Sequence, residues 1–327
     1  LFFHLKFPTP PAHGTAPPTS SSRRGPVHLS DRARAERLLG WKLAGPAFII
    51  MLAVTAYPIL NAVWLSLYNY RLTDPNARKF TFLNNYAVVL TDGLWWGAVL
   101  NTVIITVATV VVELVVGMAL AMIMNKIVIP RRTLRTVVLI PYAIITVVSA
   151  FAWKFAFAVD SGFINHWLHT LTFGTFSETY DWFGGHWSAI FAICISEIWK
   201  TTPFMSLLLL AGLSQVDSSL EEAAQVDGAT FWQRLFRVVL PNMKAAIMVA
   251  LLFRTLDAFR IFDAVFVMTG GSQDTSSVSL VAYNQTISRV EVGMGSAVSV
   301  LLFLAVLGIS TLFVKGFKVD LSQVKGE

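Results

Sequence analysis

Residues 95–125 read WWGAVLNTVIITVATVVVELVVGMALAMIMN, an apolar run interrupted by a single charged residue, Glu113. A helix needs about 20 apolar residues to cross a hydrocarbon core of about 30 Å, so this run is long enough. Its apolar residues are continuous, whereas a membrane β-barrel would show alternating segments of about ten residues. The run therefore predicts a transmembrane helix.

Five further apolar stretches are long enough to span a bilayer, and they lie at residues 43–68, 134–159, 186–214, 242–269 and 293–317. The chain of 327 residues is 55% hydrophobic and 13% charged, whereas soluble domains carry about 25% charged residues. The excess apolar surface must face lipid. These features predict an all-α integral membrane protein with six transmembrane helices.

Lysine and arginine are distributed unevenly between the two predicted sides of the membrane. The N-terminal tail, the loops after the second and fourth predicted helices and the C-terminus hold 17 of them, whereas the opposite loops hold 4. Basic residues accumulate on the cytoplasmic side, so both termini are predicted to be cytoplasmic. The chain then divides into a disordered basic tail at 1–40, a six-helix domain at 41–319 and a cytoplasmic tail at 320–327. The net charge of +6 follows from this topology and does not indicate nucleic-acid binding.

The loop at residues 217–241, on the predicted cytoplasmic side, has clear local signals. Asp217 or Ser218 can cap a short helix that carries acids in its first turn, and Gly228 can supply the positive φ that ends it. A second short helix is predicted to be amphipathic, with one face formed by Phe231, Leu235 and Val238. Such a loop is suited to docking on another protein, and the alternative is an ordinary structured loop.

The same loop resembles the EAA motif of binding-protein-dependent ABC importer permeases, and it is called the EAA loop below. The matching residues are Glu222, Ala223, Ala224, Gly228, Leu240 and Pro241, with Val238 where isoleucine is usual and Ala245 where many members have proline. The resemblance implies a type I ABC importer permease (MetI-like) fold and a coupling helix that sits in a cleft of a separate ATPase subunit. The residues that it assigns to this coupling are Glu221, Glu222, Ala223, Ala224, Asp227, Gly228, Ala229, Leu240 and Pro241.

A second stretch points to a subfamily. Phe262-Asp263 followed by Thr269-Gly270-Gly271 resembles sugar permeases of the maltose and glycerol-phosphate class, although Ser272-Gln273 replaces the usual Gly-Pro. Overall, the chain is most similar to trehalose-importer permeases. The resemblance implies disaccharide import across the cell inner membrane, with an extracytoplasmic sugar-binding protein and a second, different permease subunit as partners. An ABC permease for glycerol phosphate, an amino acid or a peptide stays open as an alternative, and so does a secondary transporter.

The chain itself is not expected to hydrolyse ATP. It has no Gly-x-x-x-x-Gly-Lys-Ser/Thr phosphate loop, so ATP and Mg are expected to bind to the partner ATPase dimer, and no cofactor is expected in this chain. Cys194 is the only cysteine, and the histidines lack the spacing of metal ligands. No metal site is predicted.

Charged residues occur inside the predicted membrane helices, where each costs about 2.5–3.5 kcal/mol if it is left alone at the centre. The resemblance to maltose-type permeases implies sugar contacts at Glu197, Lys200, Thr201, Phe204, Arg254, Asp257, Ala258 and Ile261. The alternative is an interhelical salt-bridge cluster. In a continuous helix, a spacing of three rotates each position by about 60°, so Arg254, Asp257, Arg260 and Asp263 are not expected to line one face together. Glu113 is predicted to pair with a basic residue of another helix, and Lys154 is predicted to snorkel towards water.

Overall fold

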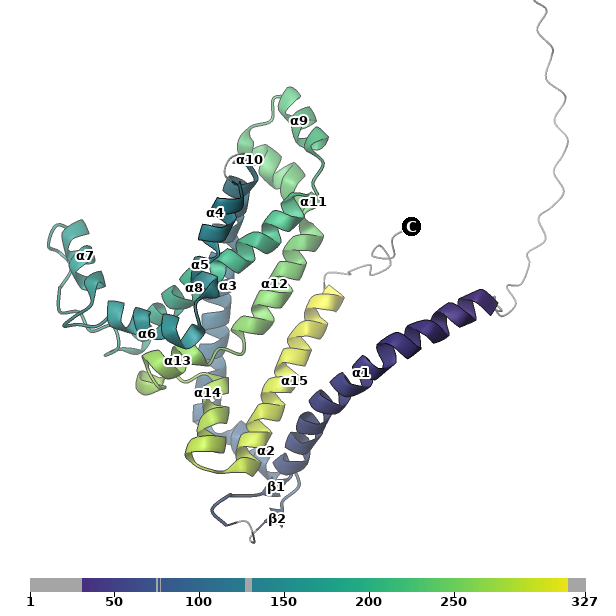
Figure 1. The fold of residues 1–327 in the computed structure, drawn as a ribbon. Helices are drawn as coiled ribbons and strands as arrows, with labels where there is room; N and C mark the ends of the chain where they lie inside the picture. Colours follow the sequence, from purple (N-terminus) through teal and green to yellow (C-terminus); the bar gives the residue numbers. More distant parts are fainter. Residues whose placement is uncertain (1–30, 75, 77, 127–130, 317–327) are drawn as a thin grey trace, which may run out of the picture. The chain divides into compact units, whose positions relative to one another are not determined.

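The computed structural model describes residues 31–74, 76, 78–126 and 131–316, and the predicted terminal tails lie largely outside this range. The described part is almost entirely helical (Figure 1). Its two strands, β1 (Tyr68–Asn69) and β2 (Lys79–Phe80), form one short antiparallel pair.

The chain divides into two compact units, residues 1–57 and 58–327. The described part of the first unit belongs to helix α1 (Asp31–Ser66), which begins inside the predicted tail and is apolar over Leu38–Ser66. The second unit contains all the other helices.

Three long helices organise the second unit, namely α3 (Gly93–Lys126), α8 (His186–Leu213) and α15 (Val292–Gly316). Helices α3 and α8 pack closely because Gly117 of α3 has no side chain. A Cβ at this position would lie 3.0 Å from Met205 Cγ and 3.3 Å from the backbone nitrogen of Ser206. The two helices are therefore in close contact at this point.

The third predicted transmembrane helix, at 134–159, is wrong as a single element. The structure has three short helices there, which are α4 (Arg131–Val138), α5 (Ile140–Ala143) and α6 (Thr146–Ala156). Pro141 lies in the first turn of α5, and Ile144 and Ile145 are extended, with ψ of 136° and 134°. Proline lacks the backbone donor that a continuous helix would need, and β-branched isoleucine tolerates an extended backbone. The segment is therefore bent at two points.

The fifth predicted helix, at 242–269, is also interrupted. It consists of α12 (Lys244–Ala258) and α13 (Asp263–Met268), separated by the non-helical residues 259–262. The EAA loop precedes α12 and contains α9 (Ser218–Val226), α10 (Phe231–Arg234), the π-helical segment η2 (Leu235–Val239) and α11 (Leu240–Asn242). The helical stretch Phe231–Asn242 meets the stretch Lys244–Met268 at 73°. Gly212 of α8 fits into this bend, because a Cβ on Gly212 would lie 2.3 Å from Ala246 Cβ.

Within the described residues, four helices are long and apolar enough to cross a membrane, and the bent pair makes a fifth candidate. The predicted number of six crossings and the cytoplasmic termini stay predictions. The shorter elements are α2 (Asn84–Thr91), α7 (Phe163–Leu171), η3 (Ser272–Asp274), α14 (Val278–Tyr283) and η4 (Asn284–Ser288).

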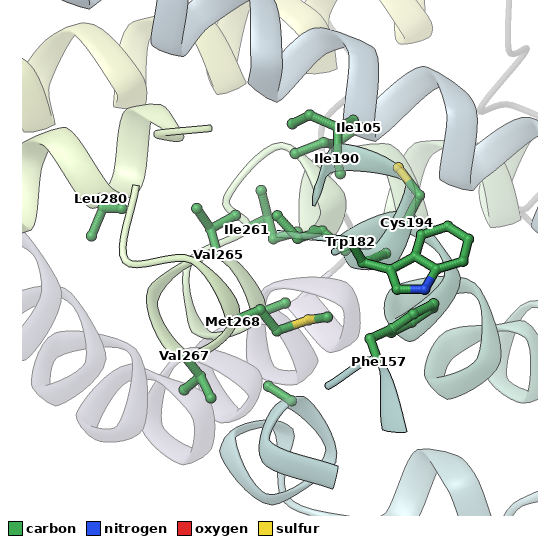
Figure 2. Packing of buried hydrophobic residues seen from close by; sticks show 14 residues of the cluster. Ile105, Phe157, Trp182, Ile190, Cys194, Ile261, Val265, Val267, Met268 and Leu280 are labelled. Atoms are coloured by element: carbon green, nitrogen blue, oxygen red, sulfur yellow. The ribbon is translucent and has the colours of Figure 1, made fainter. Parts of the chain in front are cut away.

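One hydrophobic core joins α3, α8 and α13 (Figure 2). It includes Ile105 of α3, Ile190 and Cys194 of α8, and Val265 and Met268 of α13. Phe157 and Trp182 close the same core from the segment between α6 and α8, with ring centroids 5.1 Å apart. Lys154 of α6 also holds α13, because its Nζ donates a hydrogen bond of 2.9 Å to the carbonyl oxygen of Val267. Lys154 is otherwise exposed, and its predicted snorkelling towards water stays a prediction.

Candidate functional site

Arg254 of α12 lies at the centre of a buried ionic network. The residue is 1% exposed. Its Nε donates to Glu113 Oε2 at 2.5 Å and its Nη2 donates to Glu113 Oε1 at 3.0 Å. Its Nη1 donates to Asp257 Oδ2 at 2.8 Å, and its Nη2 also lies 3.5 Å from Glu197 Oε2. The network joins α12 to α3 through Glu113 and to α8 through Glu197, and it confirms the predicted pairing of Glu113.

Thr201 of α8 completes this network. Its Oγ1 lies 2.7 Å from Glu113 Oε1 and 2.6 Å from the carbonyl oxygen of Glu197, so the hydroxyl can donate to either acceptor. Buried charges are tolerated only where they are paired and hydrogen-bonded. The predicted alternative of an interhelical salt-bridge cluster thus describes Arg254 and Glu113 well.

A polar cavity of about 400 Å³ lies beside this network. Its lining comprises Tyr142, Thr146, Glu197, Lys200, Thr201, Asp257, Arg260, Ile261, Phe262 and Asp263. Five of the predicted contact residues are among them, namely Glu197, Lys200, Thr201, Asp257 and Ile261. Phe204 is not in the lining but stacks on Tyr142, with ring centroids 5.1 Å apart. Arg254 and Ala258 are also absent from the lining, and both are buried.

Sequence reasoning missed half of the lining because it assumed continuous helices. Tyr142 and Thr146 reach the cavity from the bent segment α5–α6. The non-helical residues 259–262 let Asp257, Arg260 and Asp263 line the same cavity. Arg254 does not line it, so the four charged residues do not share one face, as predicted, although three of them do. Two signals in the sequence could have revealed these breaks. They are Pro141 in the segment of α5 and α6, and the cost of burying four charges on one helix in the segment of α12 and α13.

The cavity offers a mixed set of polar groups. Its carboxylates accept hydrogen bonds, its lysine and arginine donate them, and its hydroxyls do both. Tyr142 and Phe262 add aromatic rings, and Lys200 Nζ lies 5.4 Å from the centroid of the Tyr142 ring. A concave site with convergent polar groups and ring faces suits a small polyhydroxylated molecule.

The EAA loop is the second candidate site, and its first helix is built as predicted. Asp217 caps α9 by accepting a hydrogen bond of 2.9 Å from the backbone N–H of Ser219. This hydrogen bond holds the pKa of the Asp217 carboxyl below its usual value. Gly228 follows α9 with φ of +78°, which glycine adopts without strain.

The second helix of the EAA loop departs from the prediction. Its buried face is formed by Leu235 and Val239 rather than by Phe231, Leu235 and Val238, of which Phe231 is exposed. Leu235 and Val239 are four positions apart, which is the spacing that places two side chains on one face of a helix, so Val239 rather than Val238 shares the buried face of Leu235. Thr230 and Gln233 form a capping box at the start of α10, and Arg234 Nη1 donates to Gln225 Oε1 at 2.8 Å. This last bond joins α10 to α9.

Most of the EAA-loop residues assigned to coupling are exposed. Glu222, Ala223, Asp227, Gly228 and Pro241 are exposed, whereas Glu221, Ala224, Ala229 and Leu240 are half-buried. Val226 is 87% exposed although it is apolar. The α9 surface is therefore available for contact with another molecule.

The sequence matches the model of a protein family over residues 113–317, and the family is described as binding-protein-dependent transport system inner membrane component. The chain is 47% identical over 283 residues to the trehalose transport system permease protein SugA of Mycobacterium tuberculosis, covering 86% of this chain and 90% of the relative. It is 37% identical over 282 residues to the trehalose/maltose transport system permease protein MalF of Thermococcus litoralis, covering 86% and 94%.

The fold is similar to a chain in the crystal structure of a bacterial ABC transporter involved in the import of the acidic polysaccharide alginate. The TM-score is 0.73 at 19% sequence identity, and the match covers 89% of this chain and 99% of the other. The likeness extends over nearly the whole permease fold. The family match and the sequence identity to the two relatives agree with this structural likeness. This chain is a multi-pass membrane permease that belongs to the family of binding-protein-dependent transport system inner membrane components.

Proposed function

We propose that this chain is one permease subunit of an ABC importer for a disaccharide, with trehalose as the cargo. The observation that carries the proposal is the polar cavity beside Arg254, which brings carboxylates, cations, hydroxyls and aromatic rings together among otherwise apolar helices. Trehalose is named because two relatives at 47% and 37% identity are described as trehalose or trehalose/maltose permeases.

In this proposal the cavity holds the sugar part-way across the membrane. Asp257 is the main acceptor for sugar hydroxyls, because its side chain is 64% exposed whereas that of Glu197 is 10% exposed. Lys200 and Arg260 donate to sugar oxygens, and Tyr142 offers a ring face. Arg254 does not contact the sugar but fixes the positions of Asp257 and Glu197.

The energy for transport comes from ATP hydrolysis in a separate ATPase dimer, which also binds Mg. The exposed surface of α9 docks on this ATPase and transmits its motion to the helices. The cavity then opens alternately to the two sides of the membrane. An extracytoplasmic binding protein delivers the sugar, and a second, different permease subunit completes the pathway, with both termini of this chain in the cytoplasm.

The test is uptake of labelled trehalose in cells that lack this chain, with and without its restoration. Loss and rescue of uptake support the proposal, provided that Glu222→Lys abolishes the rescue while the protein still reaches the membrane. Unchanged uptake in a strain with no second trehalose route would reject trehalose as the cargo. Competition by unlabelled maltose, glycerol phosphate or amino acids then identifies the solute class.

A secondary transporter is the second candidate, and the buried ionic network favours it because such networks also couple ions to transport. The two mechanisms separate by energy source. Uptake that stops when ATP is depleted, but persists when a protonophore dissipates the proton gradient, supports the importer. The reverse pattern would support ion coupling.

A further inference from the structure

Helix α7 (Phe163–Leu171) lies in the segment between α6 and α8, outside the long helices. It is attached near the N-terminal end of α8, whereas the EAA loop follows the C-terminal end of α8. Figure 1 shows α7 projecting away from the helices that hold the cavity. The helix plays no part in the proposed sugar site or in the proposed coupling to an ATPase.

One face of α7 is apolar and uncovered. Phe163, Trp167 and Leu171 are 45%, 60% and 74% exposed, and their spacing of four places them within about 80° of one another on the helix. The rings of Phe163 and Trp167 are in contact, with centroids 4.6 Å apart. Phe173, just beyond the helix, is 97% exposed. These four side chains are called the apolar stripe below.

The opposite face of α7 is fixed to the protein. Asn165 is buried, its Nδ2 donates to the carbonyl oxygen of Tyr180 at 2.9 Å, and its Oδ1 accepts from Trp182 Nε1 at 2.7 Å. His169 Nδ1 lies 2.7 Å from the carbonyl oxygen of Phe176. Trp182 belongs to the core of Figure 2, and Ile164 and Leu168 of α7 also pack against this core. Because this face of α7 is fixed to the protein, the apolar stripe on the other face points outward.

The backbone after α7 also holds an aromatic ring outward. Phe173 has φ of +53°, a conformation that non-glycine residues rarely adopt. Its N–H donates to the carbonyl oxygen of Thr170, and the N–H of Gly174 donates to that of His169. Holding Phe173 in this conformation with its ring 97% exposed to water costs free energy. Burial of the ring in an apolar medium offsets that cost.

We infer that the apolar stripe of α7 lies in the headgroup–acyl boundary of the outer leaflet and anchors the segment between α6 and α8 to the lipid. Helix α7 contains no Asp, Glu, Lys or Arg. Interfacial helices place Trp, Phe and Leu on their lipid side, and Trp is enriched at this depth of the bilayer. Apolar side chains are also exposed on the helices on either side, namely Phe151 and Phe155 of α6 and Trp187 of α8. This inference does not depend on the cargo, and its assignment to the outer leaflet rests on the cytoplasmic termini of the proposed function.

The test uses the assembled transporter in lipid nanodiscs, with Cys194→Ala as the background and with any cysteines of the other subunits replaced, so that spin labels attach only at chosen sites. Labels are placed singly through Trp167→Cys, Leu171→Cys and Phe173→Cys. The matched control is Ser177→Cys, because Ser177 is exposed in the same segment but lies off the stripe. The accessibility of each label to molecular oxygen, which concentrates in lipid, is compared with that to a water-soluble nickel chelate.

The inference predicts a ratio of oxygen to nickel accessibility several-fold higher at the three stripe positions than at Ser177. A high nickel accessibility at the stripe would overturn it, because the stripe would then face water. Low accessibility to both reagents would also overturn it, because a protein partner would then cover the stripe. As an independent check, bromine-labelled lipids should quench less of the total tryptophan fluorescence in Trp167→Leu than in the parent.

Discussion

Arg254 of α12 and Glu113 of α3, separated by 141 positions in the sequence, form a two-pronged ion pair with N–O distances of 2.5 and 3.0 Å. The paired atoms are buried, since the side chains are 2% and 0% exposed. Neither charge has access to bulk water, so each depends on the other for its stability in the folded protein.

Arg254→Met is predicted to destabilise the protein by about 3–5 kcal/mol, because Glu113 then stays buried without its cation. Thermal unfolding of the purified transporter measures this loss. The double variant Arg254→Met with Glu113→Leu should recover part of it, because the unpaired Glu113 carboxylate is gone while the buried Glu197 still lacks Arg254. A single variant as stable as the parent would contradict the role given to this pair.

Asp257→Asn is predicted to impair uptake but not stability. Its carboxylate is mostly exposed and faces the cavity. Hydrogen bonds to a charged group contribute about 1.5–3 kcal/mol, which raises the KM for sugar about tenfold to a hundredfold when they are lost. Glu178→Gln is the matched control, because Glu178 is exposed in the segment after α7 and is not in the cavity lining. Equal KM values for the two variants would remove Asp257 from the proposed sugar site.

Gly228→Ala is predicted to weaken the function of the EAA loop through the backbone alone. A Cβ at this position would meet nothing within 4 Å, yet φ of +78° costs an L-residue about 1–2 kcal/mol. Gly228→Asn should be milder, because asparagine tolerates the left-handed conformation better than alanine. Sugar-stimulated ATP hydrolysis by the assembled transporter should therefore fall more for alanine than for asparagine. The opposite order would show that the side chain, and not the backbone, matters there.

Gly212→Ala is predicted to loosen the contact between α8 and α12. The added methyl would lie 2.3 Å from Ala246 Cβ, and overpacking of this kind costs about 1–3 kcal/mol. Gly308→Ala on α15 is the control, because a Cβ there would meet nothing within 4 Å. Gly212→Ala should lower the unfolding temperature, while Gly308→Ala should leave it unchanged or raise it slightly, because alanine is the better helix former. If the two variants unfold together, the close approach at Gly212 does not limit stability.

Features that depend on a few neighbouring residues were predicted correctly from the sequence. The cap at Asp217 and the left-handed Gly228 follow from side-chain and backbone preferences alone. The need of Glu113 for a cation follows from the cost of a lone charge in lipid. The identity of that cation does not follow, because it depends on which helices pack side by side.

The parts of the fold and of the cavity that could not be predicted depend on breaks in the helices. A long apolar sequence satisfies the hydropathy criterion whether or not its helix is continuous, so residues 134–159 and 242–269 were predicted as uninterrupted. Tyr142 and Asp263 reach the cavity because of these breaks. By contrast, the four-residue spacing of Leu235 and Val239 could have identified Val239 on the buried face from the sequence alone.

The 73° bend before α12 has a mechanical consequence. Met243, at the corner, is 1% exposed, and its Cε would lie 3.5 Å from a Cβ on Gly212, so the inside of the corner is filled. Packed protein interiors compress little and transmit strain. The corner is therefore closely packed rather than open. In the proposed mechanism, a displacement of α9 reaches α12 as a change in the tilt of α12.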